Sequence, residues 1–69
     1  MTTQFRYRGS MITARRREYP AIEFRFDDEQ ASMQVLLEDN DWLKCENPVD
    51  LVSHAKKAVD YFLGDVAVA

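Results

Sequence analysis

The segment FRYRGSMITAR, residues 5–15, constrains the fold more than any other stretch, because polar and apolar residues alternate on both sides of a glycine. Glycine accepts the positive φ that a two-residue hairpin loop requires, so we predict a β-hairpin with Gly9 and Ser10 in its loop and Arg8 opposite Met11. Successive side chains of a strand point to opposite faces of the sheet. The predicted apolar face carries Phe5, Tyr7, Ile12 and Ala14, and the predicted basic face carries Arg6, Arg8, Met11, Thr13 and Arg15.

The same alternation returns in AIEFRF, residues 21–26, just after the turn-forming sequence EYP. The three apolar residues at even positions would share one face of a third strand, and Glu23 and Arg25 would share the other. This strand would extend both faces of the hairpin.

Residues 27–39, DDEQASMQVLLED, allow two interpretations. Their composition favours a helix, which a capping box at the start would support. The alternation of apolar and polar residues from Ala31 to Leu37 favours a strand. We predict the strand and keep the helix as the alternative, with a turn at EDND and a short strand over WLKC, residues 42–45, to follow.

The sequence ENPVDLVSHAKKAVDYFLGD, residues 46–65, has the signals of an amphipathic helix. Asn47 is a good N-cap, Pro48 suits the first helical position, and Gly64 suits the end. One apolar stripe follows helical spacing and consists of Leu51, Val52, Ala55, Val59, Phe62 and Leu63. The final DVAVA would add a short edge strand or fray.

These elements predict an α+β fold for the whole chain. An antiparallel sheet of four to five strands would be packed by one C-terminal amphipathic helix, in a single domain over residues 1–69. We expect Tyr61 and Phe62, near the end of the helix, to make core or dimer contacts.

The charge of the chain is divided between its two parts. Residues 1–25 carry six arginines against two acids, a net charge of +4, while residues 26–69 carry three lysines against ten acids, a net charge of −7. A basic strand face is explained by solvation, by a protein partner or by nucleic acid, since arginine suits bidentate contact with phosphate. The candidate contacts on this face are Arg6, Arg8, Arg15, Arg17 and Arg25. Against nucleic acid, the net charge of the whole chain is −3, and its aromatic residues fall on the opposite face of the hairpin.

A second candidate surface is acidic, and its residues fall in two predicted loops: Asp27, Asp28 and Glu29 form one cluster, and Glu38, Asp39, Asp41 and Glu46 form the other. Asp39 and Asp41 fall in a predicted loop, where acidic residues commonly serve solubility. The alternative is a docking surface for a basic partner, such as a protein that itself binds nucleic acid. Trp42 follows directly, and we interpret it as a core anchor, with an exposed interface hot spot as the alternative.

The chain holds few of the groups from which active sites are built. Cys45 and His54 are its only cysteine and its only histidine, which is too few for a four-ligand zinc site of these residues. A thiol–base pair between them has no specific support, and the sequence contains no glycine-rich phosphate loop. We therefore expect no enzyme activity, no cofactor and no metal site.

The sequence also gives expectations about compartment and assembly. No apolar run approaches the ~20 residues that span a membrane, and the N-terminus lacks the apolar core of a signal peptide. With a free cysteine, this predicts a cytoplasmic protein without a membrane partner. A core of this size supplies about 3–5 kcal/mol of net stability, so a homodimer or docking on a partner would support it.

The order of three strands and then a helix resembles the HicB-type antitoxin domain, in which a small curved sheet is backed by a helix. AKKAVDYFL, residues 55–63, and YPA, residues 19–21, carry the resemblance, which covers residues 19–63. The family's PDLPG and GDT segments are absent, and LLEDNDWLKCENP stands in their place, so we transfer no functional residue. The resemblance implies a small acidic protein that neutralises another protein.

In general character the chain also resembles small acidic inhibitors of host defence that phages encode, such as anti-CRISPR proteins. We therefore predict a non-catalytic protein–protein interaction module, an inhibitor or antitoxin-like regulator of a larger protein. The alternative is a nucleic-acid-binding module that uses the arginines of the N-terminal hairpin.

Overall fold

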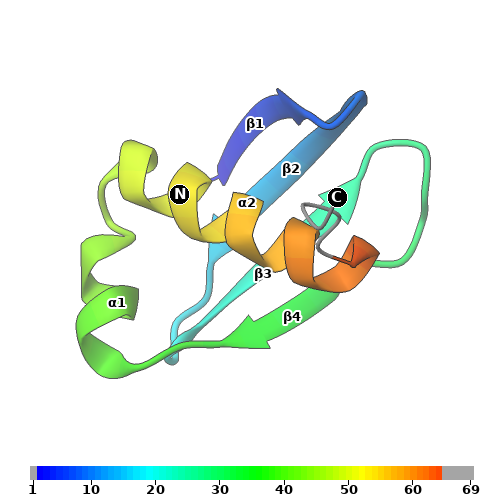
Figure 1. The fold of residues 1–69 in the computed structure, drawn as a ribbon. Helices are drawn as coiled ribbons and strands as arrows, with labels where there is room; N and C mark the ends of the chain where they lie inside the picture. The colour runs from blue at the N-terminus through cyan, green and yellow to red at the C-terminus, as the bar shows by residue number, and fades with distance from the viewer. Residues whose placement is uncertain (1, 65–69) are drawn as a thin grey trace.

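The computed structural model describes residues 2–64, which form a four-stranded antiparallel sheet with one long helix across it (Figure 1). The strands are β1 (Thr2–Tyr7), β2 (Ser10–Arg16), β3 (Ala21–Phe26) and β4 (Met33–Leu36), and the helices are α1 (Asp39–Lys44) and α2 (Pro48–Leu63). The strands lie in the order β1-β2-β3-β4, so each is paired with its neighbour in sequence. The predicted α+β class, an antiparallel sheet with a C-terminal helix, is confirmed.

The first hairpin forms, with its loop one residue earlier than predicted. The loop residues are Arg8 and Gly9, with φ of 53° and 82°, and Phe5 lies opposite Ile12. A tight two-residue loop of this kind takes positive φ at both positions, and glycine supplies it at the second. Moving the loop by one residue shifts each cross-strand partner by two positions. Because side chains alternate with a period of two, the predicted division into an apolar and a polar face survives.

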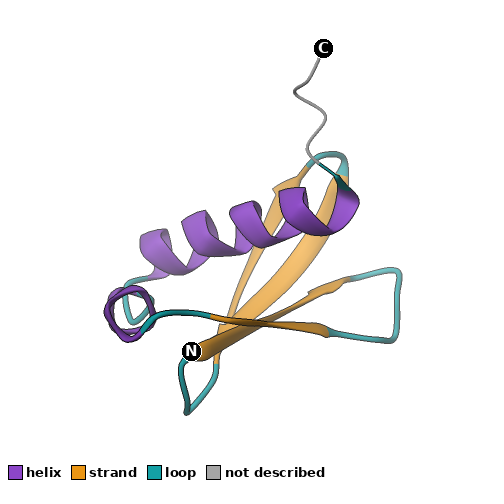
Figure 2. Cartoon of the chain, turned by 60° about the horizontal axis from the view of Figure 1, so that its bottom comes forward, coloured by secondary structure: helices purple, strands orange, loops and turns teal. Residues whose placement is uncertain are grey.

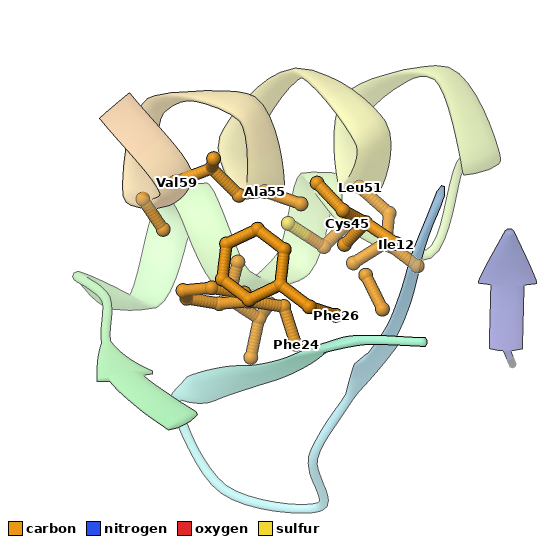
Figure 3. Close-up of a cluster of buried hydrophobic side chains, with 10 residues drawn as sticks. Ile12, Phe24, Phe26, Cys45, Leu51, Ala55 and Val59 are labelled. Carbon is orange, nitrogen blue, oxygen red and sulfur yellow. The ribbon is translucent and has the colours of Figure 1, made fainter. Parts of the chain in front are cut away.

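The core lies between the sheet and α2. Figure 3 shows side chains from α2 meeting those of β2 and β3. Phe24, at the centre of β3, is 1% exposed, and its ring packs edge-on against Phe26 with centroids 6.0 Å apart. The buried cluster comprises Ile12, Ala14, Ile22, Phe24, Phe26, Cys45, Leu51, Ala55, Ala58 and Val59. The alternation in β2 and β3 therefore fixes which face the helix covers.

Helix α2 begins and ends as predicted. The backbone N–H of Val49 donates to the side-chain oxygen of Asn47 at 2.9 Å, Pro48 is the first helical residue, and Gly64 follows the last with a φ of 88°. These contacts satisfy a backbone donor that the first turn leaves free and stop the helix at a residue that tolerates left-handed backbone. Within the described part of the chain, neither helix has the length and apolar content that crossing a membrane would take.

The predicted apolar stripe of α2 is only partly buried. Leu51, Ala55 and Val59 are fully buried, whereas Phe62 is 55% exposed and Leu63 is 47% exposed. The residues before β4 form a loop, so no strand covers the outer side of the last helical turn. Of the two residues expected to make core or dimer contacts, Phe62 packs its ring against Phe24 and Phe26, whereas Tyr61 is 90% exposed and does not belong to the core.

The segment between β3 and α2 differs most from the prediction. A strand is confirmed, but β4 covers only Met33–Leu36. The short strand predicted at residues 42–45 is wrong, because residues 39–44 form helix α1. Acidic residues in the first turn of α1 and Lys44 in its last turn interact favourably with the helix dipole. These interactions help to stabilise this short helix. The predictions for the final DVAVA fall outside the described residues.

Candidate protein-binding surfaces

The face of the sheet opposite α2 carries most of the predicted arginine contacts. Figure 2 shows α2 along one face of the sheet, with no described helix on the other. We call this second face the open face; its outward residues are Thr2, Gln4, Arg6, Met11, Thr13, Arg15, Glu23, Arg25, Gln34 and Leu36. Arg6, Arg15 and Arg25 therefore lie on the face that the alternation assigned to them.

Glu23 lies among the arginines of the open face and pairs with two of them. Arg15 Nε donates to Glu23 Oε1 at 2.6 Å, and Arg17 Nη1 donates to the same oxygen at 3.0 Å. A hydrogen bond from the Ser32 hydroxyl, with the bond from Arg15, lowers the pKa of Glu23 to about 2. The carboxylate therefore stays ionised at any physiological pH and offsets much of the local positive charge.

A second carboxylate, Asp27, reaches the open face from the end of β3. It accepts hydrogen bonds from Gln4 Nε2 at 2.7 Å and from Thr13 Oγ1 at 3.0 Å. Arg25 Nη1 donates to the carbonyl oxygen of Glu29 at 2.9 Å. Arg6 is the exception, since it has no hydrogen-bond or ion-pair partner among residues 2–64. The open face thus holds cations and anions side by side.

Arg8 does not belong to the open face, contrary to the prediction. Its place in the hairpin loop brings its guanidinium to Asp60 of α2, with Nη1 3.1 Å from Oδ1. The hydroxyl of Tyr7 donates to the same carboxylate at 2.8 Å. These contacts join the hairpin to the helix, so the predicted place of Arg8 on the basic face is wrong, and its role as a partner contact stays a prediction. The one-residue shift of the loop is the cause.

Trp42 holds α1 against the end of β2. Its indole Nε1 donates to the carbonyl oxygen of Arg17 at 2.9 Å, and Arg16 Nε donates to the carbonyl oxygen of Trp42 at 2.8 Å. The guanidinium of Arg16 also lies over the indole ring, 3.9 Å from its centre. Trp42 is only half-buried and lies outside the buried cluster. It is thus an anchor at the edge of the core, and Arg16, which the sequence analysis did not single out, is its main contact.

Asp39 and Asp41 of the predicted acidic surface lie on a helix and not in a loop. Asp39 is exposed, and both it and Asp41 belong to the first turn of α1. Asp41 Oδ1 is 4.0 Å from His54 Nε2 of α2. The favourable charge–dipole interaction at a helix N-terminus gives these acids a structural role. The neighbouring Trp42 contacts Arg16 and Arg17, so α1 and the end of β2 lie together.

Cys45 and His54 are not arranged as a nucleophile and its base. Cys45 is fully buried in the core, and burial raises the pKa of its thiol. A raised thiol pKa opposes formation of the reactive thiolate. Among residues 2–64, no three histidine, cysteine, aspartate or glutamate side chains gather as a metal would need.

The surface that sequence reasoning missed lies at the C-terminal end of α2. A hollow of about 350 Å³ opens between this end and the loop that leads to β4. We call it the apolar hollow; it is lined by Ser10, Phe26, Asp28, Glu29, Ala31, Met33, Phe62 and Leu63. Tyr61, which precedes Phe62 in the helix and does not line the hollow, is 90% exposed. The signal in the sequence was the run Tyr61-Phe62-Leu63, because one stripe of a helix cannot bury three successive side chains.

Comparisons with known proteins found no relative: no family model matches the chain, and neither a curated protein nor a solved structure is similar to it. The functional argument therefore rests on the residues of this chain.

Proposed function

We propose that this protein is a small non-catalytic protein–protein interaction module, an inhibitor or antitoxin-like regulator that binds a larger protein. The observation that carries the proposal is the exposed apolar end of α2. Tyr61 is 90% exposed, Phe62 55% and Leu63 47%, and Phe62 and Leu63 line the apolar hollow. Large aromatic side chains beside a pocket are typical of the hot spots that hold protein partners.

The charge arrangement supports a protein partner over nucleic acid. A phosphate backbone is held by cations that are free to neutralise it. On the open face, Arg15 and Arg17 are already paired with Glu23, and Asp27 adds a second negative charge.

The test is affinity capture from the lysate of the native host, with and without nuclease, with the full chain as bait. Tyr61→Ser leaves the core untouched, and Phe62→Ser removes a half-buried ring of the hollow. Val49→Ser is the matched control, since Val49 is a 75% exposed apolar residue at the other end of the same helix. Circular dichroism checks that all three variants are folded.

We expect the wild-type chain and Val49→Ser to capture one protein in near-stoichiometric amount. Both substitutions at the end of α2 should lower this capture at least about tenfold, as loss of a hot spot does. Equal capture by all variants would remove the binding surface from this end of the helix. Recovery of nucleic acid alone, lost after nuclease treatment, would replace the proposal by the nucleic-acid alternative.

A further inference from the structure

The apolar hollow combines an apolar floor with an acidic rim. Phe26 and Phe62 form part of the floor, with ring centroids 6.1 Å apart and planes tilted by 42°. Phe26 is almost fully buried, while more than half of Phe62 remains exposed. An apolar side chain entering the hollow would cover the exposed part of this ring, which is a favourable loss of apolar surface from water.

The rim consists of Asp28 and Glu29, in the loop between β3 and β4. Both are exposed, and within residues 2–64 their carboxylates accept no hydrogen bond and form no ion pair. Their backbone is held in place, because the N–H of Glu29 donates to the carbonyl of Phe26 at 2.9 Å and its carbonyl accepts from Arg25 at 2.9 Å. No lysine or arginine belongs to the described lining of the hollow. The rim therefore presents two exposed carboxylates, and the backbone of Glu29 is held next to the guanidinium of Arg25.

A second copy of the chain is a poor occupant of this hollow. A two-fold symmetric dimer places the same patch of each copy against the other. Two acidic rims would then face each other, and like charges at an interface oppose association. The negative net charge of the whole chain, −3, adds to this repulsion.

We propose that the hollow binds a segment of the protein partner in which apolar side chains lie beside lysine or arginine. This inference rests on the proposed function and specifies the chemistry of the partner. The apolar side chains would cover Phe62, and the basic side chains would pair with Asp28 and Glu29. Charge complementarity of this kind raises the rate of encounter and excludes acidic competitors.

Three capped peptides probe the inference: acetyl-GRLFRG-amide, acetyl-GELFEG-amide and acetyl-GRSSRG-amide. Each is titrated into the ¹⁵N-labelled full chain, and the amide resonances of Met33 and Phe62 are followed. We expect the basic apolar peptide to shift both resonances and to bind at least about fivefold tighter than either of the others. The difference should shrink as salt is added, because exposed charges are screened.

The charge-reversed variant Asp28→Lys/Glu29→Lys should prefer the acidic apolar peptide. The variant Glu18→Lys/Glu46→Lys is the matched control. It changes the net charge of the chain equally at two exposed acids outside the hollow, and it should keep the wild-type preference. Equal loss of preference in both variants would mean that only net charge matters, which overturns the inference.

Three further outcomes would overturn the inference about the partner's chemistry or identify another occupant of the hollow. Tighter binding of the acidic apolar peptide to the wild-type chain overturns the inference and leaves the proposed function intact, since the hollow would still bind a peptide. Shifts of the same amides when the protein alone is concentrated identify a second copy as the occupant. Shifts on removal of residues 65–69, with peptide binding only afterwards, identify the chain's own end. The proposed function is tested by a separate experiment, the affinity capture with the Tyr61→Ser variant, so the two proposals can fail independently.

Discussion

The two faces of the sheet are built from the same strands, yet different forces hold their side chains. On the face beneath α2, Phe24 and its neighbours are removed from water and packed against one another. On the open face, Arg15 and Glu23 are held by a hydrogen-bonded ion pair that remains partly in contact with water. Hydrophobic burial supplies most of the free energy of folding, whereas exposed ion pairs contribute little. The comparison teaches that burial beneath α2 holds the fold together, whereas on the open face the charge of Arg15 is offset within the chain by Glu23.

The apolar hollow lies where the helix-covered face ends. There, the last turn of α2 is only partly covered by the sheet. The ring of Phe62 packs against Phe24 of the core, and more than half of the residue remains exposed to solvent. Such a side chain is already ordered by its neighbours, so it loses less conformational entropy when a partner binds there. This region combines the apolar character of one face with the accessibility of the other.

The largest contrast between the faces should come from two adjacent residues of β3. We expect Phe24→Ala to cost about 3–5 kcal/mol, since it removes a buried ring and leaves a cavity. That loss is comparable with the entire stability of a domain of this size, about 3–5 kcal/mol. Arg25→Ala, one residue along and on the open face, should cost only about 0.5–1.5 kcal/mol for its hydrogen bonds. Urea unfolding followed by circular dichroism measures both, and similar costs would contradict the contrast.

The next effect concerns the helix that covers the closed face. Asn47→Ala removes the side-chain oxygen that accepts from the N–H of Val49. We expect a loss of about 1 kcal/mol in the free energy of unfolding. Asn47→Ser keeps a capping oxygen and should retain most of the stability, so equal losses in the two variants would exclude the cap as the cause.

A smaller and pH-dependent effect is expected on the open face. The pKa of Glu23 is about 2 in the folded chain, below its ordinary value of 4.5. Because its folded pKa is lowered, Glu23 stabilises the fold above pH 4.5, and this contribution is lost as the pH falls from 4.5 through 2. Glu23→Gln should cost about 0.2–1 kcal/mol at pH 7 and weaken the loss of stability across that interval.

Glu18→Gln, at an exposed acid between β2 and β3, is the control for this prediction. Urea midpoints at pH 6 and pH 3 should differ less in Glu23→Gln than in the wild type, and Glu18→Gln should behave as the wild type does. A carboxyl titration by NMR that gives Glu23 a pKa near 4.5 would show that the network on the open face does not favour its ionised form.

The smallest effect is expected at Arg6, which has no partner among residues 2–64. Arg6→Glu should change the free energy of unfolding by less than about 0.5 kcal/mol, because it lies away from the core and from the ion pairs. It should also leave capture of the partner unchanged. If capture were lost while the fold stayed intact, the binding surface would lie on the open face after all.

Much of this fold follows from local patterns in the sequence. The alternation in β2 and β3 assigns Phe24 and Arg25 to opposite faces, because side chains of a strand alternate whatever the neighbouring strand is. The cap at Asn47 and the stop at Gly64 act within one helical turn, so they are visible in the sequence. The hairpin loop lies one residue earlier than predicted, which moves each cross-strand partner by two positions. Because side chains alternate with a period of two, each strand residue stays on its predicted face.

What only the tertiary structure decided depends on groups far apart in the sequence. Because Arg8 lies in the hairpin loop, its guanidinium pairs with Asp60 of α2. Trp42 donates to the carbonyl oxygen of Arg17 and lies under the guanidinium of Arg16. These contacts hold α1 at the residues where a strand was predicted. The pairing of Arg15 with Glu23 follows from the register between β2 and β3. The exposure of the end of α2 depends on how far the sheet extends beneath the helix. The sequence by itself determined which side chains share a face, because that requires only the period of the backbone, whereas the charge and exposure of each surface depend on where separate elements meet.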